Sequence, residues 1–394
     1  MSEWAEGSLA DLVHEVTSLR VEDPSVHELA TVRLYARGLA PTGKKPNKTK
    51  RGRPHFTRHM GEILVGRQNF NRQCVGVVTP ELDGFVTSNA ISAFLPNDGI
   101  DKDYALLVMA SPDTALAADH MMPGTGQREI SVRNLLAIPA LVPPLPVQER
   151  VVEVIGAVDD QIAALRAEAT ALNCVLDSLR DRLPTAPDVP IGDVLTAIES
   201  GRSVQAGGEA TDVDEFRILK ISAVQRGWFK PNEAKTLADN SGFSPSHLVS
   251  EDDLLITRAN TPQRVGYVAM AHGVSPGTYM PDLVWRLRPD EHQVSARYLE
   301  HALSSTPMRS RIAVTSGGTS TSMVKINKRG FSSVRIPVPE LSEQAAYAAR
   351  CTAVMDQSTS TRTEAERLRA VRASLLSALL NREIEIDAAE EAVA

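Results

Sequence analysis

The amino-acid sequence predicts a mixed α/β protein in which two α/β domains alternate with two long helices. Three observations lead to this prediction. The second half of the chain repeats the first, each copy ends in a long helical pattern of apolar residues, and the charge is distributed unevenly. The length of 394 residues is enough for two to four domains of ordinary size.

The repeat consists of short matching segments that occur in the same order in both halves. The pairs are 9–13 with 191–195, 61–69 with 252–260, 75–76 with 265–266, 123–126 with 317–320, 130–135 with 326–331, 142–148 with 338–344 and 157–161 with 353–357. They align Arg67 with Arg258 and Asn69 with Asn260. The offset drifts between 182 and 196 residues, which indicates a tandem duplication with insertions and deletions rather than a solenoid.

The first part of each copy, residues 1–145 and 184–339, mixes short β-type runs with turn clusters. The runs are Glu62–Val65, Val75–Val78, Leu254–Thr257, Val265–Met270 and Leu283–Leu287. The turn clusters include Asn97–Gly99 and Ser275–Gly277. Short strands bounded by such turns are typical of a mixed α/β domain.

The second part of each copy, residues 146–183 and 340–394, is predicted to be a long helix that follows a proline-rich stop. In the first copy, apolar residues at alternating steps of four and three are Val151, Ile155, Val158, Ile162, Leu165, Ala169, Leu172, Leu176, Leu179 and Leu183. In the second copy they include Tyr347, Cys351, Val354, Leu368, Leu375 and Leu379, with polar interruptions at Ser358, Thr361 and Arg372. This spacing predicts a coiled coil between the two copies. The alternative is that each helix packs on its own α/β domain.

The formal net charge of −7 lies entirely in the two helical segments, which carry −3 and −4. By contrast, Thr31–Gly76 holds eleven basic residues and one acid, and His301–Pro339 holds six basic residues and no acid. Clustered cations of this kind suit a polyanion such as DNA. A solvated loop without a partner is the alternative for each window.

The cysteines and the chain start indicate a reducing compartment. Cys74, Cys174 and Cys351 are too far apart in sequence for a zinc site or a disulfide framework. The first residues are acidic and lack the pattern of a secretory signal, and no apolar run is long enough to span a membrane. We therefore expect a cytoplasmic protein without a membrane partner.

The order of these features resembles the specificity (S) subunit of type I restriction-modification systems. Each α/β domain ends in a stop, Val142-Pro-Pro-Leu or Val338-Pro-Glu-Leu, followed by a glutamine and a long helix. The most specific segments are 316–320 and 336–344. The first copy departs from the pattern, because it has Val147 where the second copy has Glu343.

The resemblance implies a bacterial or archaeal protein with two target-recognition domains, 1–145 and 184–339, each of which recognises one half of a bipartite double-stranded DNA target. It implies that segments 146–183 and 340–394 form an antiparallel coiled coil that sets the gap between the half-sites. The chain would hold no catalytic centre, metal or cofactor. Its partners would be modification subunits, which bind S-adenosylmethionine and methylate DNA, and restriction subunits.

Candidate DNA contacts follow from side-chain chemistry, since Arg, Asn and Gln suit base edges and Lys, Ser and Thr suit phosphates. For base contacts these are Arg67, Asn69, Arg72, Arg258, Asn260, Gln263 and Arg264. For phosphate contacts they are Lys44, Lys45, Lys48, Lys50, Arg51 and Arg53 in a basic segment, 43–58, and Thr319, Ser320, Thr321 and Lys325. A surface salt bridge or a structural cap is the alternative for each residue.

Enzymatic functions rest on weaker patterns. Gly38–Lys45 approaches a phosphate-binding loop but has Lys45 in place of the hydroxyl residue that binds magnesium. His55 and His59 lack the glutamate of a zinc protease helix, and Glu233-Ala-Lys235 lacks a preceding aspartate for a nuclease site. The rival hypotheses are a nuclease or ATP-dependent component of a defence system, and a coiled-coil adaptor without specific DNA binding.

Overall fold

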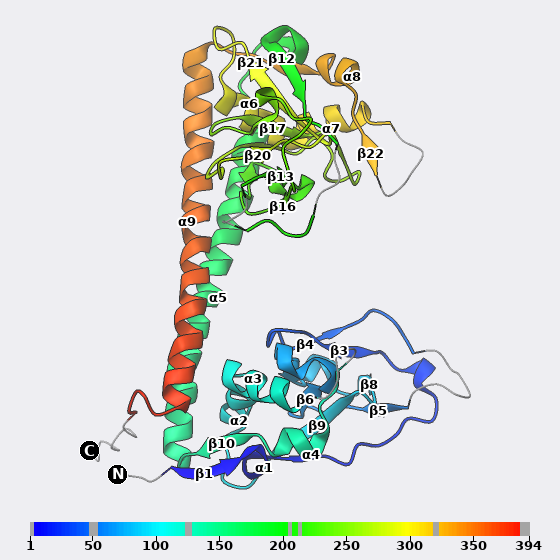
Figure 1. The fold of residues 1–394 in the computed structure, drawn as a ribbon, viewed down its shortest axis with the longest axis vertical. Helices are drawn as coiled ribbons and strands as arrows, with labels where there is room; N and C mark the ends of the chain where they lie inside the picture. The colour runs from blue at the N-terminus through cyan, green and yellow to red at the C-terminus, as the bar shows by residue number, and fades with distance from the viewer. Residues whose placement is uncertain are drawn as a thin grey trace. The chain divides into compact units, whose positions relative to one another are not determined.

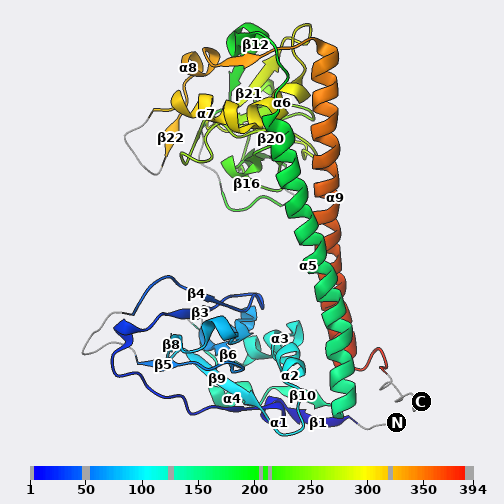
Figure 2. The same ribbon diagram turned by 180° about the vertical axis from the view of Figure 1, so that it is seen from behind.

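The computed structural model describes residues 4–46, 54–122, 128–203, 207–211, 215–317 and 323–386. The chain divides into two compact units, which we call unit 1, Met1–Leu165 with Thr363–Ala394, and unit 2, Arg166–Arg362. Each unit holds one α/β domain together with a segment of each long helix (Figures 1 and 2). The predicted mixed α/β character is confirmed.

Unit 1 is built on a four-stranded antiparallel sheet in the order β2-β9-β6-β7. Its elements are β1 (Ala5–Ser8), α1 (Leu9–Leu12), β2 (Val13–Glu15), η1 (Pro24–Val26), β3 (Ala30–Val32), β4 (Leu39–Pro41), β5 (His55–Thr57), β6 (Ile63–Gly66), η2 (Arg67–Arg72), β7 (Val75–Val77), η3 (Pro80–Leu82), β8 (Val86–Ser88), β9 (Ile91–Pro96), α2 (Lys102–Met109), α3 (Pro112–Met121), α4 (Val132–Leu136) and β10 (Pro139–Val142). The pairs β1–β10, β3–β4 and β5–β8 form smaller sheets. The main core joins the sheet to α2 and α3.

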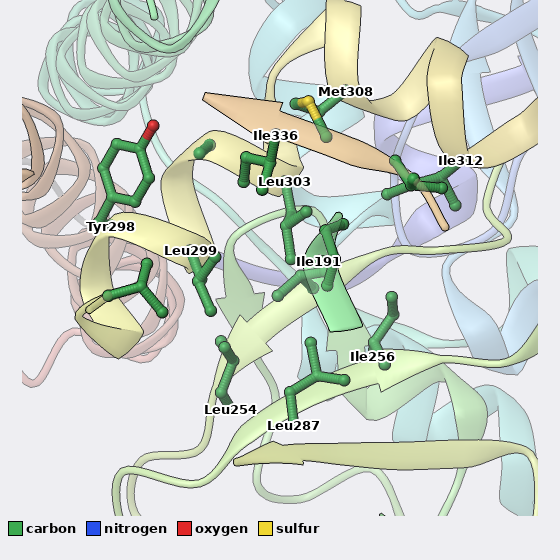
Figure 3. Close-up of a cluster of buried hydrophobic side chains, with 14 of the residues drawn as sticks. Ile191, Leu254, Ile256, Leu287, Tyr298, Leu299, Leu303, Met308, Ile312 and Ile336 are labelled. Carbon is green, nitrogen blue, oxygen red and sulfur yellow. The ribbon is translucent and has the colours of Figure 1, made fainter. Parts of the chain in front are cut away.

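Unit 2 repeats this plan with a four-stranded antiparallel sheet in the order β12-β21-β17-β19. Its elements are β11 (Asp188–Pro190), η4 (Ile191–Val194), β12 (Leu195–Ser200), β13 (Arg217–Leu219), η5 (Ile221–Ala223), β14 (Val224–Gln225), β15 (Trp228–Phe229), β16 (Ala234–Thr236), η6 (Pro245–His247), β17 (Leu254–Thr257), β18 (Ala259–Asn260), β19 (Val268–Met270), β20 (Thr278–Tyr279), β21 (Val284–Pro289), α6 (Ala296–Ser304), α7 (Thr306–Val314), β22 (Val324–Lys325), α8 (Lys328–Ser332) and β23 (Arg335–Pro337). Figure 3 shows Leu254, Ile256 and Leu287 of the sheet meeting side chains of α6 and α7 in the buried core.

Equivalent glutamines hold equivalent backbone groups in the two units. The Gln148 side chain accepts a hydrogen bond from the backbone N–H of Asp101 (2.8 Å) and donates to the carbonyl of Pro143 (2.8 Å). Gln344 accepts from the N–H of Ser295 (2.9 Å) and donates to the carbonyls of Pro339 and Gln293 (both 2.8 Å). The repeat is therefore a repeat of structure.

One of the sequence alignments within the repeat is wrong. The sequence aligns Val75-Gly76 with Val265-Gly266, but the strand register pairs Leu64 with Gly76 in unit 1 and Leu255 with Ala269 in unit 2. Gly76 therefore corresponds to Ala269. The loop after β17 is longer than the loop after β6, so a short Val-Gly pair matched out of register.

The two long helices are α5 (Leu145–Asp181) and α9 (Leu341–Leu380), and within each unit their segments run in opposite directions. In unit 1, Arg372 donates to both carboxylate oxygens of Asp159 (2.6 and 2.7 Å). In unit 2, the Tyr347 hydroxyl donates to the carbonyl of Arg180 (2.8 Å), and the Ser358 hydroxyl hydrogen-bonds Asn173 (3.1 Å).

The predicted seam positions lie on the packed side of these helices. Buried members are Val151, Ile155, Ile162, Leu165, Ala169, Leu176, Tyr347, Cys351, Ala365 and Leu379, and half-buried members are Val158, Leu172, Leu179, Leu183, Val354, Leu368 and Leu375. Ser358 and Thr361 are buried as well. Over the ranges that the structure describes, no helix combines the length and apolar character needed to cross a membrane.

Candidate nucleic-acid interface

Arg67 and Arg258 occupy the same position in the two units, directly after the equivalent strands β6 and β17. The Arg67 backbone N–H donates to Ala90, and the Arg67 carbonyl accepts from Ile130 (both 3.1 Å). The Arg258 backbone makes the same bonds with Leu283 and Ile326 (both 2.9 Å). The alignment of the two arginines is therefore a structural equivalence.

The Arg67 side chain lies at the edge of a cleft of about 550 Å³ that Phe56 and Asn89 also line. Its Nη2 donates to the carbonyl of Asn89 (2.7 Å) and forms an ion pair with Glu129 (2.8 Å). The side chains of Arg67 and Glu129 remain 22% and 39% exposed. Both can therefore be reached from solvent while their charges compensate each other.

Arg258 has a different neighbour. Its Nη1 donates to the carbonyl of Asp282 (3.4 Å), and its guanidinium carbon lies 5.9 Å from the centre of the Trp285 ring. Strand β18 pairs with β22, which places Ala259 opposite Lys325 and Asn260 opposite Val324. Arg258 directly precedes β18, Asn260 lies in β18, and Lys325 lies in the neighbouring strand β22, where it is exposed.

Other predicted residues are accessible but more scattered. Asn69 and Arg72 are exposed in η2, and Gln263 and Arg264 are exposed in the turn after β18. Lys44 and Lys45 are exposed in the turn after β4. The predicted residues that lie outside the described ranges are Lys48, Lys50, Arg51, Arg53, Thr319, Ser320 and Thr321.

Several basic residues counted in the two windows bind groups of the protein itself, so fewer cations are available to a polyanion than the sequence count indicates. Arg58 is only 2% exposed and donates to the Thr87 hydroxyl and the Ile91 carbonyl (2.7 and 2.6 Å). Burial lowers the pKa of its guanidinium. Arg309 lies over the Tyr267 ring at 4.3 Å, and Arg311 pairs with Asp188 at 2.9 Å. A guanidinium has five donors and readily binds such protein acceptors.

The enzymatic patterns find no support from their local structure. Residues 39–41 of the Gly38–Lys45 segment form strand β4, which pairs with β3, so this stretch is not a loop that opens a helix. Glu233 accepts from the Ser222 hydroxyl (2.7 Å) and lies 3.6 Å from Lys220. Among the described residues, no three or more His, Cys, Asp or Glu side chains lie close enough together to hold a metal ion.

Sequence reasoning missed Glu129, the ion-pair partner of Arg67. The offset of 196 that aligns Ile130 with Ile326 also aligns Glu129 with Lys325. This reversal of charge at an equivalent position was the signal that could have identified it.

Comparisons with known proteins agree on one family. Residues 187–370 match the family model described as the type I restriction modification DNA specificity domain. A 155-residue stretch is 24% identical to the type I restriction enzyme EcoEI specificity subunit of Escherichia coli, and it spans 39% of this chain and 26% of that protein.

A solved structure shows a similar fold. It is titled as the structural basis of complex assembly and conformational transition of the type I R-M system. It aligns with a TM-score of 0.55 and 15% identity over 96% of this chain and 97% of its own. These findings confirm the resemblance that the sequence predicted.

Proposed function

We propose that this chain, which carries a type I restriction modification DNA specificity domain in residues 187–370, is the specificity subunit of such a system and recognises a bipartite DNA target. The observation that carries the proposal is the structural repeat. The two units share one sheet order and present an arginine at the same strand end. Two similar binding units in one chain suit a target made of two half-sites.

In this proposal, each unit contacts one half-site through the polar side chains around its shared arginine. In unit 2, Arg258 and Asn260 supply donors and an acceptor for base edges in the major groove, together with Gln263 and Arg264. In unit 1, Arg67, Asn69 and Arg72 have this role. Lys44, Lys45 and Lys325 are exposed and suit phosphate contacts, which add affinity that is independent of sequence. The remaining predicted phosphate contacts, Lys48, Lys50, Arg51, Arg53, Thr319, Ser320 and Thr321, belong to the same proposal.

The helical segments 146–183 and 340–394 have a different role in the proposal. They act as an antiparallel coiled-coil spacer between the half-sites, and their net charges of −3 and −4 disfavour DNA and suit contact with protein subunits. The partners are modification subunits, which carry S-adenosylmethionine and the methylation chemistry, and restriction subunits. The chain itself contributes recognition rather than catalysis and works in the cytoplasm.

Methylome sequencing of cells that produce this chain with its modification subunits tests the proposal. We expect methylation within a split target with a fixed gap. Exchanging residues 191–335 for those of a relative should change one half of the target, and exchanging residues 9–139 should change only the other half. If deleting the chain removes no methylated sequence while the modification subunits remain active, the proposal is wrong.

A further inference from the structure

The two units carry opposite charges beside their equivalent arginines. Because Ile130 and Ile326 donate to the carbonyls of Arg67 and Arg258, the residues before them, Glu129 and Lys325, are also equivalent. Glu129 belongs to unit 1 and Lys325 to unit 2. An acid in one unit therefore stands where a base stands in the other.

This exchange changes what each position offers a ligand. In unit 1 the ion pair of 2.8 Å combines the donors of Arg67 with a half-exposed carboxylate, so the position presents donors and an acceptor with no net charge. In unit 2, Arg258 and Lys325 present donors only: Arg258 donates to the carbonyl of Asp282 and lies over the Trp285 ring, and within the part of the chain that the structure describes neither side chain forms an ion pair with a carboxylate.

The Arg67–Glu129 pair and the two cations Arg258 and Lys325 suit different base edges in the major groove. A carboxylate accepts a hydrogen bond from the amino group of cytosine, while an arginine donates to O6 and N7 of guanine. A carboxylate also repels phosphate oxygens and the acceptor edge of guanine. A position with two cations favours guanine and its flanking phosphates.

We propose that Glu129 and Lys325 determine specificity at equivalent positions of the two half-sites, an inference that rests on the proposed function. Glu129 accepts from the amino group of a cytosine, and Arg67 donates to the guanine of the same or the adjacent base pair. In the other half-site, Lys325 binds the phosphate beside the recognised base, as in the proposed function, and it places no carboxylate beside Arg258, which therefore donates to a guanine. Equivalent positions in the duplicated fold thereby select different base patterns.

The test uses the purified complex of this chain with its modification subunits and a DNA pool in which every target base pair is varied in turn. Competitive binding followed by sequencing gives a penalty for each substitution. In Glu129→Lys, we expect the penalty for replacing one C·G pair of the half-site bound by unit 1 to fall by about 10- to 150-fold, the value of one hydrogen bond to a charged group. Lys325→Glu should change one position in the other half-site.

Two further variants separate specificity from charge and from folding. Glu22→Lys makes the same charge change at an exposed acid of unit 1 and should strengthen binding to all sequences equally. Glu129→Gln keeps a carbonyl acceptor without the charge and should retain a weakened preference for cytosine. Thermal melting of each complex verifies that the variants are folded.

The outcomes distinguish this inference from the proposed function. If the wild-type complex shows no bipartite preference, the proposed function fails. If the wild type is selective but Glu129→Lys shifts binding to all sequences equally, as Glu22→Lys does, only the role of Glu129 is overturned. A half-site for unit 1 without a C·G pair would overturn it as well.

Discussion

Units 1 and 2 share their backbone framework but differ in the chemistry of their interiors. Where the domain meets the long helices, unit 2 buries a polar cluster: His301 accepts from Arg180 (3.4 Å) and hydrogen-bonds the Thr352 hydroxyl (2.9 Å). In unit 1, Leu107 takes the place of His301 and Gly156 takes the place of Thr352. Both residues line a mostly apolar pocket of about 360 Å³. The two units therefore share backbone hydrogen bonds that stabilise the fold, while the side chains buried at this position differ.

The central sheets differ in the same way. Strand β17 pairs Leu255 with Arg286, and Arg286 forms a buried ion pair with Asp253 at 2.9 Å. The equivalent pair in unit 1 is Leu64 with Ala93, and Glu62 takes the place of Asp253. Unit 2 thus has an internal charge pair at a position where the described residues of unit 1 form no ion pair.

Breaking the buried ion pair of unit 2 should give the largest loss of stability. Asp253→Asn should lower the free energy of unfolding by about 3 kcal/mol, because it removes one of the two carboxylates that lie 2.9 Å from the buried Arg286 guanidinium and leaves Glu199 as the other. Urea unfolding monitored by the fluorescence of the buried Trp285 measures the loss. The matched change Glu62→Gln in unit 1 should cost less, about 1–2 kcal/mol, because it removes the attraction of the Glu62 carboxylate for the buried Arg58 guanidinium but breaks no ion pair between described residues. Equal losses in the two units would contradict the comparison.

The shared glutamines should give matched effects in the two units. Gln148→Leu and Gln344→Leu each leave a partly buried backbone N–H and a buried proline carbonyl without the glutamine partner, at a cost of about 2–3 kcal/mol. Hydrogen exchange should show faster opening of unit 1 in the first variant and of unit 2 in the second. If the unit that carries the substitution exchanges its backbone amide hydrogens as slowly as in the wild type, its glutamine is dispensable.

Acidification should weaken unit 2 through His301. Burial, followed by the nearby Arg180 and Arg297, lowers the pKa of His301 to about 3, and the buried Glu300 lies next to it in the chain. The unfolded chain takes up a proton near pH 6.5 that the folded unit refuses. Stability is therefore complete above that pH and falls as the pH drops towards 3, by about 2 kcal/mol at pH 5.

Unfolding titrations at pH 7.5 and pH 5 measure this loss. His301→Gln should remove this part of the pH dependence. Unit 1, which has Leu107 at the equivalent position, should lack it from the start. An unchanged pH dependence in His301→Gln would show that another group titrates.

The smallest expected effect is a gain. Gly156 lies within α5, and a methyl group added to it would meet no atom within 4 Å. Gly156→Ala should stabilise unit 1 by about 0.5–1 kcal/mol, because alanine loses less backbone entropy in a helix. A rise in the melting temperature of unit 1 measures the gain. A fall would mean that a methyl group in the pocket beside Gly156 destabilises the unit.

The sequence predicted what depends on local periodicity and order. The heptad positions of the long helices and the alignment of Arg67 with Arg258 follow from spacing along the chain. The burial of Arg58 does not, because its partners Thr87 and Ile91 come from a distant segment. The Arg67–Glu129 pair joins residues that are 62 positions apart, so only the three-dimensional structure brings them together.

The division of the long helices between the units has a consequence for synthesis. The core of unit 1 includes Leu376 and Leu379, which lie near the end of α9. A ribosome therefore completes unit 2, residues 166–362, before it has made the last core residues of unit 1. Domains generally fold from the N-terminus during translation, but here unit 1 can complete its core only after unit 2 has been synthesised.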